Sequence, residues 1–319
     1  MICPVHKTSS PGLGRVLSAV EFVSGWLLLH KQGESELGTL VRDYLQAQHA
    51  AVVKRLDRFS DLRPQYAENL VPAVEGEAFH KLVWPKVSSL IDAGMARSIE
   101  RYARTTKRRG EIKKAVPRTG IYHNSEGILI NVLGVQLEAL KAELSFSFGQ
   151  QYWESVTETT RNGLRGIILD GLTTGKTSGD IARKIATDES GLFSLARAKT
   201  IARTETTSAL NAGHWAFAEE LLGDPETGVI GREWVTVGDN DVRKSHEWAN
   251  GQRVKQGQLF TLAGGQARFP GDPWLPGSER INCRCTIVEV FSWDKDMPTV
   301  IPSDSMLEEM MFSVPELVL

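Results

Sequence analysis

The last third of the chain holds the stretch that decides the fold, Trp234-x4-Asp239-x-Asp241-x-Arg243-x2-His246, followed further on by Asn282-Cys283-Arg284-Cys285. Two of the three cysteines in the protein lie one residue apart there, downstream of an isolated histidine. If residues 283–285 are extended, both thiols point to the same side, because strand side chains alternate with a period of two. One small ion could then touch both sulfur atoms, so we expect any specific chemistry in this region.

Length and composition indicate a globular protein. The chain has 319 residues, of which 41% are hydrophobic and 24% charged, and it is long enough for two domains with separate cores. The net charge of -2 gives no general attraction to nucleic acid or membranes, so either role would need local charge. Three cysteines cannot form a disulfide framework, which favours a reducing compartment such as a bacterial cytoplasm.

One apolar segment near the start, residues 16–29, raises the question of a membrane. It is too short to span a bilayer, and Glu21 interrupts it. No small-residue cleavage site follows before Lys31, so a secretion signal is not indicated. The segment predicts an amphipathic helix packed on protein, and no membrane partner is expected.

The periodicity of apolar residues predicts an α+β fold, with a long, mainly helical N-terminal region followed by a small α+β C-terminal module with short strands. Through residues 37–109 apolar side chains recur at steps of three and four, and Pro64, Pro72 and Pro85 mark the expected helix boundaries. The predicted divisions are a helical region at 1–120, a helical region leading into the module at 121–223, the module at 224–293 and an acidic tail at 294–319.

Local signals refine these divisions. Thr177 is expected to cap the start of a helix, because Ile181 and Ile185 follow at helical spacing. Beyond residue 224, β-branched and aromatic residues appear in short runs, which predict strands at 229–230, 232–237 and 286–291.

A basic stripe is predicted near the end of the N-terminal region. Arg97, Arg101, Arg104 and Arg108 fall at steps of four, three and four, which stacks them on one helix face, and Arg109 follows. Residues 97–118 hold nine basic and two acidic residues, a local charge of +7. The stripe could bind phosphates or an acidic partner protein, and a solvated helix face explains it equally well.

His246, Cys283 and Cys285 are candidate ligands of a structural metal site, because imidazole and thiolate are good donors for zinc. The spacing does not give the fourth ligand, for which Asp241 and Asp239 are candidates. A pair of small buried residues beside a hydrogen-bonded histidine explains the same pattern without a metal.

Water or His214 could also complete the site, and the choice changes the expected function. A fourth protein ligand closes a zinc site and makes it structural, whereas water leaves an open Lewis-acid position. In the open case the chain would be a metal-dependent hydrolase with Glu247 or Glu279 as the base.

The pattern as a whole resembles the phage Mu F-like minor head proteins, also called phage head morphogenesis proteins. The resemblance covers about residues 192–290, with a looser helical match from residue 128. The matching pieces, in order, are Ala202-Arg203-Thr204-Glu205-Thr206 with Asn211, then Trp234 with Asp239, Asp241, Arg243, Ser245, His246 and Gly251, then Phe260, Pro270 and Asn282-Cys283-Arg284-Cys285.

The resemblance implies a non-enzymatic structural protein of a tailed-phage head, associated with the portal vertex and acting in head assembly. Its implied partners are the portal protein and capsid or scaffold proteins, and its implied location is the virion, with the host cytoplasm during assembly. Some relatives are ejected with the DNA, so packaged double-stranded DNA is a further implied contact. Other relatives carry a toxin or enzyme domain after this module, and the chain stops too soon after Trp293 to hold one.

Within the module we expect a structural network of polar residues: Arg203, Glu205, Asn211, Asp241, Arg243 and Asn282. Arg203 and Glu205 are expected to tie their helix to the module by charge-assisted hydrogen bonds. Two alternatives to a head protein stay open, a metal-dependent hydrolase at the His246, Cys283 and Cys285 site and a nucleic-acid-binding adaptor that uses the basic stripe.

Overall fold

The computed structural model describes residues 13–72, 74–109, 139, 141–145, 153–222 and 227–292. The longer elements are helices α1 (Leu13–Leu56), α3 (Val74–Arg109), α5 (Trp153–Thr173), α6 (Ser178–Ala186) and α7 (Leu195–Leu222) and strands β1 (Val229–Val235) and β5 (Thr286–Phe291). The shorter ones are η1 (Pro64–Tyr66), α2 (Ala67–Leu70), α8 (Lys244–Ala249), β2 (Arg253–Val254), β3 (Phe260–Leu262), β4 (Gly265–Ala267) and α9 (Gly277–Arg280). These elements confirm the predicted α+β class, with long helices first and short antiparallel strands last.

The chain divides into two compact units. Unit 1 consists of Met1–Gln32, Ser88–Lys141 and Arg203–Leu319, and unit 2 of Gly33–Val87 and Ala142–Ala202. Helices α1, α3 and α7 each contribute residues to both units. The divisions at 1–120, 121–223 and 224–293 stay predictions. The predicted tail at 294–319 lies outside the described residues.

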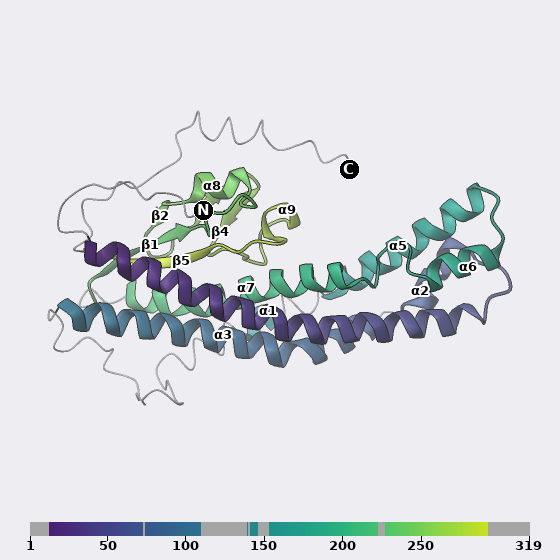
Figure 1. Ribbon diagram of the computed structural model, residues 1–319, viewed down its shortest axis with the longest axis horizontal. Helices are drawn as coiled ribbons and strands as arrows, with labels where there is room; N and C mark the ends of the chain where they lie inside the picture. The colour runs from purple at the N-terminus through teal and green to yellow at the C-terminus, as the bar shows by residue number, and fades with distance from the viewer. Residues whose placement is uncertain are drawn as a thin grey trace. The chain divides into compact units, whose positions relative to one another are not determined.

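Unit 1 contains an antiparallel sheet in the order β2-β1-β5 (Figure 1). The predicted strand at 286–291 is confirmed as β5, and all six of its residues are buried. The two short runs expected at 229–230 and 232–237 are instead one strand, β1, with an irregular register between Val229 and Gly231. A bulge at this point explains why the alternating pattern looks broken in the sequence.

An aromatic cluster joins the sheet of unit 1 to its helices. Tyr102 of α3 stacks on Phe291 of β5 with 6.3 Å between ring centroids, and it meets the edge of Phe217 of α7 at 6.0 Å. Trp234 of β1 is completely buried, as expected for a core residue, whereas Trp274 is 62% exposed and does not belong to the core. Burial of such large rings supplies much of the apolar area that a small sheet lacks.

Helices α3 and α7 cross at a pair of glycines within unit 1. A Cβ atom added to Gly213 would lie 1.8 Å from the carbonyl oxygen of Ile91, and one added to Gly94 would lie 2.0 Å from that of Leu210. Only glycine allows the two backbones to approach this closely, so each glycine fits against the other helix.

Gly213→Ala is therefore expected to destabilise the protein by at least about 1–3 kcal/mol, because the helices must separate to admit the methyl group. Gly166→Ala is the matched control, since a Cβ at this position in α5 meets no atom within 4 Å. The control should stabilise by about 0.5–1 kcal/mol through helix propensity. Urea unfolding curves measure both changes, and similar midpoints for the two variants would show that the crossing is not close.

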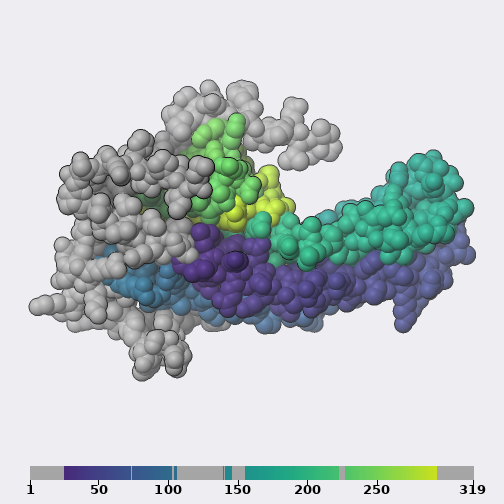
Figure 2. Space-filling model, in the orientation of Figure 1, coloured from purple at the N-terminus to yellow at the C-terminus, as the bar shows by residue number. Residues whose placement is uncertain are grey.

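Unit 2 is built from helices with apolar residues at helical spacing. Leu37, Val41 and Leu45 of α1 are buried at steps of four, and Tyr44 stacks on Phe79 of α3 with 4.2 Å between ring centroids. Thr177 caps α6 as predicted, in a capping box with Asp180. The side chains of α5 and α6 form one continuous surface of this unit (Figure 2).

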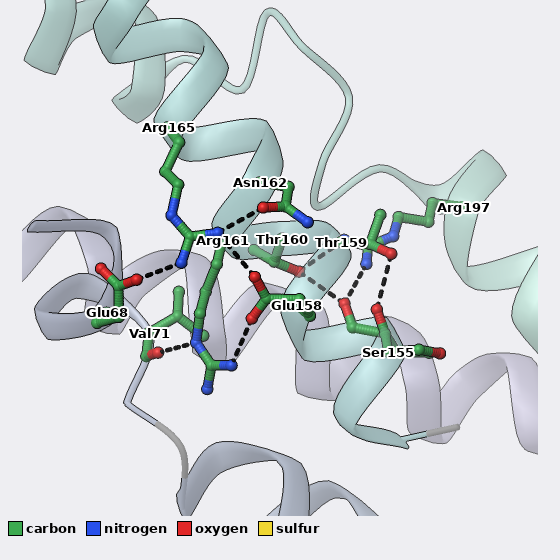
Figure 3. Close-up of polar contacts among 11 residues, drawn as sticks. Glu68, Val71, Ser155, Glu158, Thr159, Thr160, Arg161, Asn162, Arg165 and Arg197 are labelled. Atoms are coloured by element: carbon green, nitrogen blue, oxygen red, sulfur yellow. Dashed lines mark hydrogen bonds and ion pairs between the residues drawn. The ribbon is translucent and has the colours of Figure 1, made fainter. Parts of the chain in front are cut away.

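Two arginines of α5 fasten this helix to the loop and short helix before α3. Glu158 accepts hydrogen bonds from Arg161 at 2.8 Å and Arg165 at 2.7 Å, and Arg161 also donates to the carbonyl oxygen of Val71 at 2.7 Å (Figure 3). Arg165 further pairs with Glu68 of α2. Residues far apart in the sequence are thus joined by charge-assisted hydrogen bonds.

One expected helix boundary is wrong. Pro85 lies inside α3 rather than at its end, so α3 continues past a residue that lacks the backbone N–H. Packing of the buried residues Phe79, Val83 and Val87 on both sides of the proline outweighs the lost hydrogen bond. Among the helices that the structure describes, none has both the length and the apolar character needed to cross a bilayer.

Candidate functional site

The structure brings His246, Cys283 and Cys285 together in unit 1. Nδ1 of His246 lies 3.4 Å from Sγ of Cys285 and 3.6 Å from Sγ of Cys283, and the three donor atoms all lie within 4.8 Å of one another. The histidine is on α8, and the cysteines directly precede β5. All three side chains are buried, with at most 3% of each residue exposed. We call this group the His-Cys-Cys cluster.

The other ring nitrogen of His246 faces a carboxylate. Nε2 lies 3.1 Å from Oε2 of Glu279, which is on α9. Glu279 also accepts hydrogen bonds from Ser245 Oγ at 2.7 Å and from the backbone N–H of Gly264 at 3.0 Å. Burial raises the pKa of Glu279, but hydrogen bonds from His246 and Ser245 prevail and hold it below its usual value. Glu279 is therefore an ionised group that fixes the ring orientation.

The local environment shifts the pKa values of the two thiols in opposite directions. Burial opposes ionisation of Cys283, yet hydrogen bonds with Cys285 and His246 lower the pKa of Cys283 well below its usual value. The hydrogen bond with Cys283, together with burial, raises the pKa of Cys285. Burial lowers the pKa of His246, but contacts with Cys283 and Glu279 outweigh it and raise that pKa. The imidazole thus lies between negative groups on both sides.

One face of α7 holds the backbone that carries the cysteines. Thr207 donates a hydrogen bond to the carbonyl oxygen of Cys283, and Asn211 donates to that of Cys285 at 2.8 Å. Thr204 accepts a hydrogen bond from the backbone N–H of Asn282 at 3.1 Å. Steps of three and four place these α7 side chains on one face of the helix. The helix therefore sets the direction in which both sulfur atoms point.

Two further contacts of the expected network secure the same segment. Glu205 of α7 accepts two hydrogen bonds from Nη2 of Arg280, each 3.0 Å long, and both side chains are at least 95% buried. Asn282 has a φ of 60°, a left-handed conformation that asparagine tolerates better than most residues. Asn211 also donates to the carbonyl oxygen of Pro270 at 3.1 Å and accepts from Thr286 at 2.9 Å.

Asp239 and Asp241 do not join the His-Cys-Cys cluster. Arg284, between the two cysteines, pairs with Asp239 at 2.6 Å and lies 3.5 Å from Asp241, whose side chain is 86% exposed. Arg243 turns to backbone oxygens, donating to those of Ser278 at 2.6 Å and Ile281. The expected fourth ligands are therefore on the surface, because the alternation that points both thiols inward points Arg284 outward.

The basic stripe is not a free row of guanidinium groups. Arg101 is 9% exposed and pairs with the fully buried Glu289 of β5. Arg97 and Arg104 both pair with Glu100 on the same helix. One of the two acidic residues in 97–118 therefore pairs with two arginines of the stripe. The prediction that Arg101 binds phosphates or a partner protein is therefore wrong, because its guanidinium group is buried against Glu289. The side chains of Arg108 and Arg109 lie outside the described residues.

Sequence patterns did not identify several residues of this buried network. His214 of α7 lies 2.9 Å from Oε1 of Glu289, whose other oxygen contacts Arg101. Burial, with the charges of Arg101 and Arg232, lowers the pKa of His214 well below its usual value. The partners are separated by 75 to 188 residues, and no spacing rule connects such positions. Thr204 and Thr207 were detectable, since they share the helix face of Asn211.

His30 of α1 extends the network. Its Nε2 lies 2.8 Å from Oγ1 of Thr207, the hydroxyl that holds Cys283. Burial, followed by the charges of Arg203 and Arg284, lowers the pKa of His30 to about 4. Arg203 of the expected network thus acts on this imidazole through its charge.

The depressed pKa of His30 makes stability pH-dependent. Because the unfolded chain binds a proton near pH 6.5 and the folded protein only near pH 4, stability present above pH 6.5 is lost as the pH falls between these values. The slope from this one group is at most about 1.4 kcal/mol per pH unit. His30→Gln, which keeps a donor for Thr207, should unfold in urea with a flatter pH dependence than the wild type. Parallel profiles would show that folding does not change the pKa of His30.

These observations define the class of module. It is a small antiparallel sheet, and threonine, asparagine and glutamate side chains of helix α7 hold the cysteine segment that leads into strand β5. Residues 162–288, which include α7, the sheet as far as the first half of β5, and the His-Cys-Cys cluster, match the family described as "Phage Mu protein F like protein". The resemblance to this family is therefore confirmed, and the chain carries a phage Mu F-like domain over these residues.

Two curated relatives are similar to parts of the chain. "Minor head protein GP7" of Bacillus phage SPP1 is 26% identical over 140 residues, which cover 44% of this chain and 43% of that protein. "NAD(+)--arginine ADP-ribosyltransferase EFV" of Enterococcus faecalis (strain ATCC 700802 / V583) is 35% identical over 127 residues, covering 39% of this chain and 24% of that protein. The chain thus spans less than half the length of either relative. No solved structure is significantly similar to the chain.

Proposed function

We propose that this chain is a minor head protein of a tailed bacteriophage, associated with the portal vertex and acting in head assembly. The observation that carries the proposal is the Mu F-like domain at residues 162–288, together with the similarity to a minor head protein over 44% of the chain. Its partners are the portal protein and capsid or scaffold proteins, and it resides in the virion after assembly in the host cytoplasm.

Residues outside the matched domain supply the docking surface. Helices α1 and α3 lie wholly before residue 162 and span 44 and 36 residues. Long helices offer extended area to a large assembly, while the buried polar network keeps the module folded without many partners. Contact with packaged DNA is the weaker part of the proposal, because Arg97, Arg101 and Arg104 each have an acidic partner within the protein.

A metal-dependent hydrolase is less well supported than a head protein. Substrate would need to reach a site whose three donors are almost completely buried, and Glu279 is already engaged by His246, Ser245 and Gly264. Similarity to an ADP-ribosyltransferase covers only 24% of that enzyme, so we attribute it to a shared module and assign no enzymatic activity to this chain.

A pull-down from cells that assemble heads tests the portal contact. Tagged full-length chain should recover the portal protein, identified by mass spectrometry, whereas Leu28→Asp/Leu82→Asp, which adds charge to exposed positions of α1 and α3, should not. The matched control is the variant Arg183→Ala, which changes an exposed charge on α6 and should recover the portal protein normally. Recovery of nucleic acid without any head protein, lost in high salt, would favour the nucleic-acid-binding adaptor instead.

A further inference from the structure

We propose that the His-Cys-Cys cluster binds one Zn²⁺ ion through Nδ1 of His246 and the thiolates of Cys283 and Cys285, and that this ion fastens helix α8 to the start of strand β5. The proposal is independent of the head-protein function. It concerns only residues of unit 1, and each step rests on the positions of these side chains.

The distances between the donor atoms fit a tetrahedral zinc site. Zinc binds sulfur at about 2.3 Å and nitrogen at about 2.0–2.1 Å, which at tetrahedral angles separates the two donors by about 3.5 Å. Nδ1 of His246 lies 3.4 Å from one sulfur and 3.6 Å from the other. Both sulfur atoms therefore face the same imidazole nitrogen at separations that one zinc ion can bridge.

The surroundings match those of a metal ligand. A zinc-bound histidine usually donates its second ring N–H to a carboxylate, and Glu279 lies 3.1 Å from Nε2 of His246. Because Thr207 and Asn211 already fix the carbonyl groups of both cysteines, binding requires little rearrangement of the backbone.

A water molecule fills the fourth position in this proposal. Among the residues that the structure describes, the group that could hold a metal comprises His246, Cys283 and Cys285 alone. An ordinary three-ligand zinc site with water would be open to substrate, but these donors are at most 3% exposed. The ion therefore has a structural role. Its binding displaces the thiol protons to solvent, so affinity should fall as the pH is lowered.

Metal analysis of the intact protein gives the direct test. Full-length chain, refolded with Zn²⁺ and passed through a desalting column, should retain about one equivalent, and Co²⁺ in its place should give a sulfur-to-cobalt charge-transfer band with tetrahedral ligand-field bands. The double variant Cys283→Ser/Cys285→Ser should retain no ion and show no such band. Cys3→Ser is the matched control and should bind like the wild type.

A second pair of variants tests the carboxylate that orients the ring. Glu279→Ala should weaken zinc binding about 10–100-fold in a competition with a chromophoric chelator. Glu247→Ala changes an exposed glutamate on the same helix as His246 and should leave the affinity unchanged. A loss in both variants, or in neither, would contradict the assigned role of Glu279.

Other outcomes overturn the proposal as a whole. Folded wild-type protein that binds neither Zn²⁺ nor Co²⁺ would show that the cluster is a hydrogen-bonded group only. Retention of a full equivalent by the double cysteine variant would place the ion elsewhere. A mass lower by two hydrogens in the purified protein, restored by a reductant, would instead identify a disulfide between Cys283 and Cys285. None of these results would affect the head-protein assignment.

Discussion

Arg101→Ala is expected to destabilise the folded protein by about 3–5 kcal/mol, the loss typical when one partner of a buried ion pair is removed. The substitution leaves the carboxylate of Glu289 without its guanidinium group, and Glu289 is completely buried. His214, which contacts the other oxygen of Glu289, cannot compensate, because burial, the largest cause of its lowered pKa, and the charge of Arg232 both remain in the variant. The free energy of unfolding from urea titrations measures the loss.

Arg104→Ala provides the matched control for this experiment. It lies one turn further along α3, is 62% exposed and pairs with Glu100 on the same helix. Exposed pairs of this kind contribute about 0.2–1 kcal/mol. If Arg101→Ala lost as little stability as Arg104→Ala, Arg101 would lie on a solvated helix face, as the spacing of the arginines alone allows. If both lost several kcal/mol, Arg104 would be buried as well.

Glu205→Ala should cost about 3–5 kcal/mol for the same physical reason. It removes the carboxylate that receives two hydrogen bonds from Arg280, which is itself only 5% exposed. The uncompensated guanidinium lies just before Asn282 and the cysteine segment, so the loss should also loosen the His-Cys-Cys cluster.

A double-mutant cycle separates this pair from other consequences of the substitution. Glu205→Ala/Arg280→Ala should be clearly less damaging than the sum of the two single variants, because neither charge is then left unpaired. Thermal and urea unfolding of the four proteins give the coupling energy. Strictly additive losses would mean that the two side chains contribute separately and that the pair does not anchor the module on α7.

Sequence patterns predicted those features that depend on neighbours along the chain. The α+β class, the helix N-cap near Thr177 and the strand at 286–291 are local, and the structure confirms them. Pro85 shows the limit of such rules, since buried residues on both sides carry α3 through it. The bulge near Gly231 likewise conceals a continuous strand, because one extra residue reverses the alternation.

Sequence patterns predicted only part of the candidate site. Alternation indicated that Cys283 and Cys285 face one side, but no spacing rule brings His246 to them across 37 residues. That expectation came from the donor chemistry of imidazole and thiolate. The pairing of Arg101 with Glu289 was missed because the spacing of arginines along a helix shows only which of them share a face. Whether β5 buries that face depends on tertiary packing, which the spacing does not contain. Zinc binding stays a prediction.

The composition of purified heads is the most direct test of the account. Heads from cells that produce the phage should contain this chain in a fixed, low ratio to the portal protein, measured by quantitative mass spectrometry after gradient purification. Heads assembled without the chain should be fewer or defective, and wild-type protein supplied in trans should restore them. A chain that remains in the soluble fraction, absent from intact heads whose number and form are normal without it, would contradict the assignment to the head.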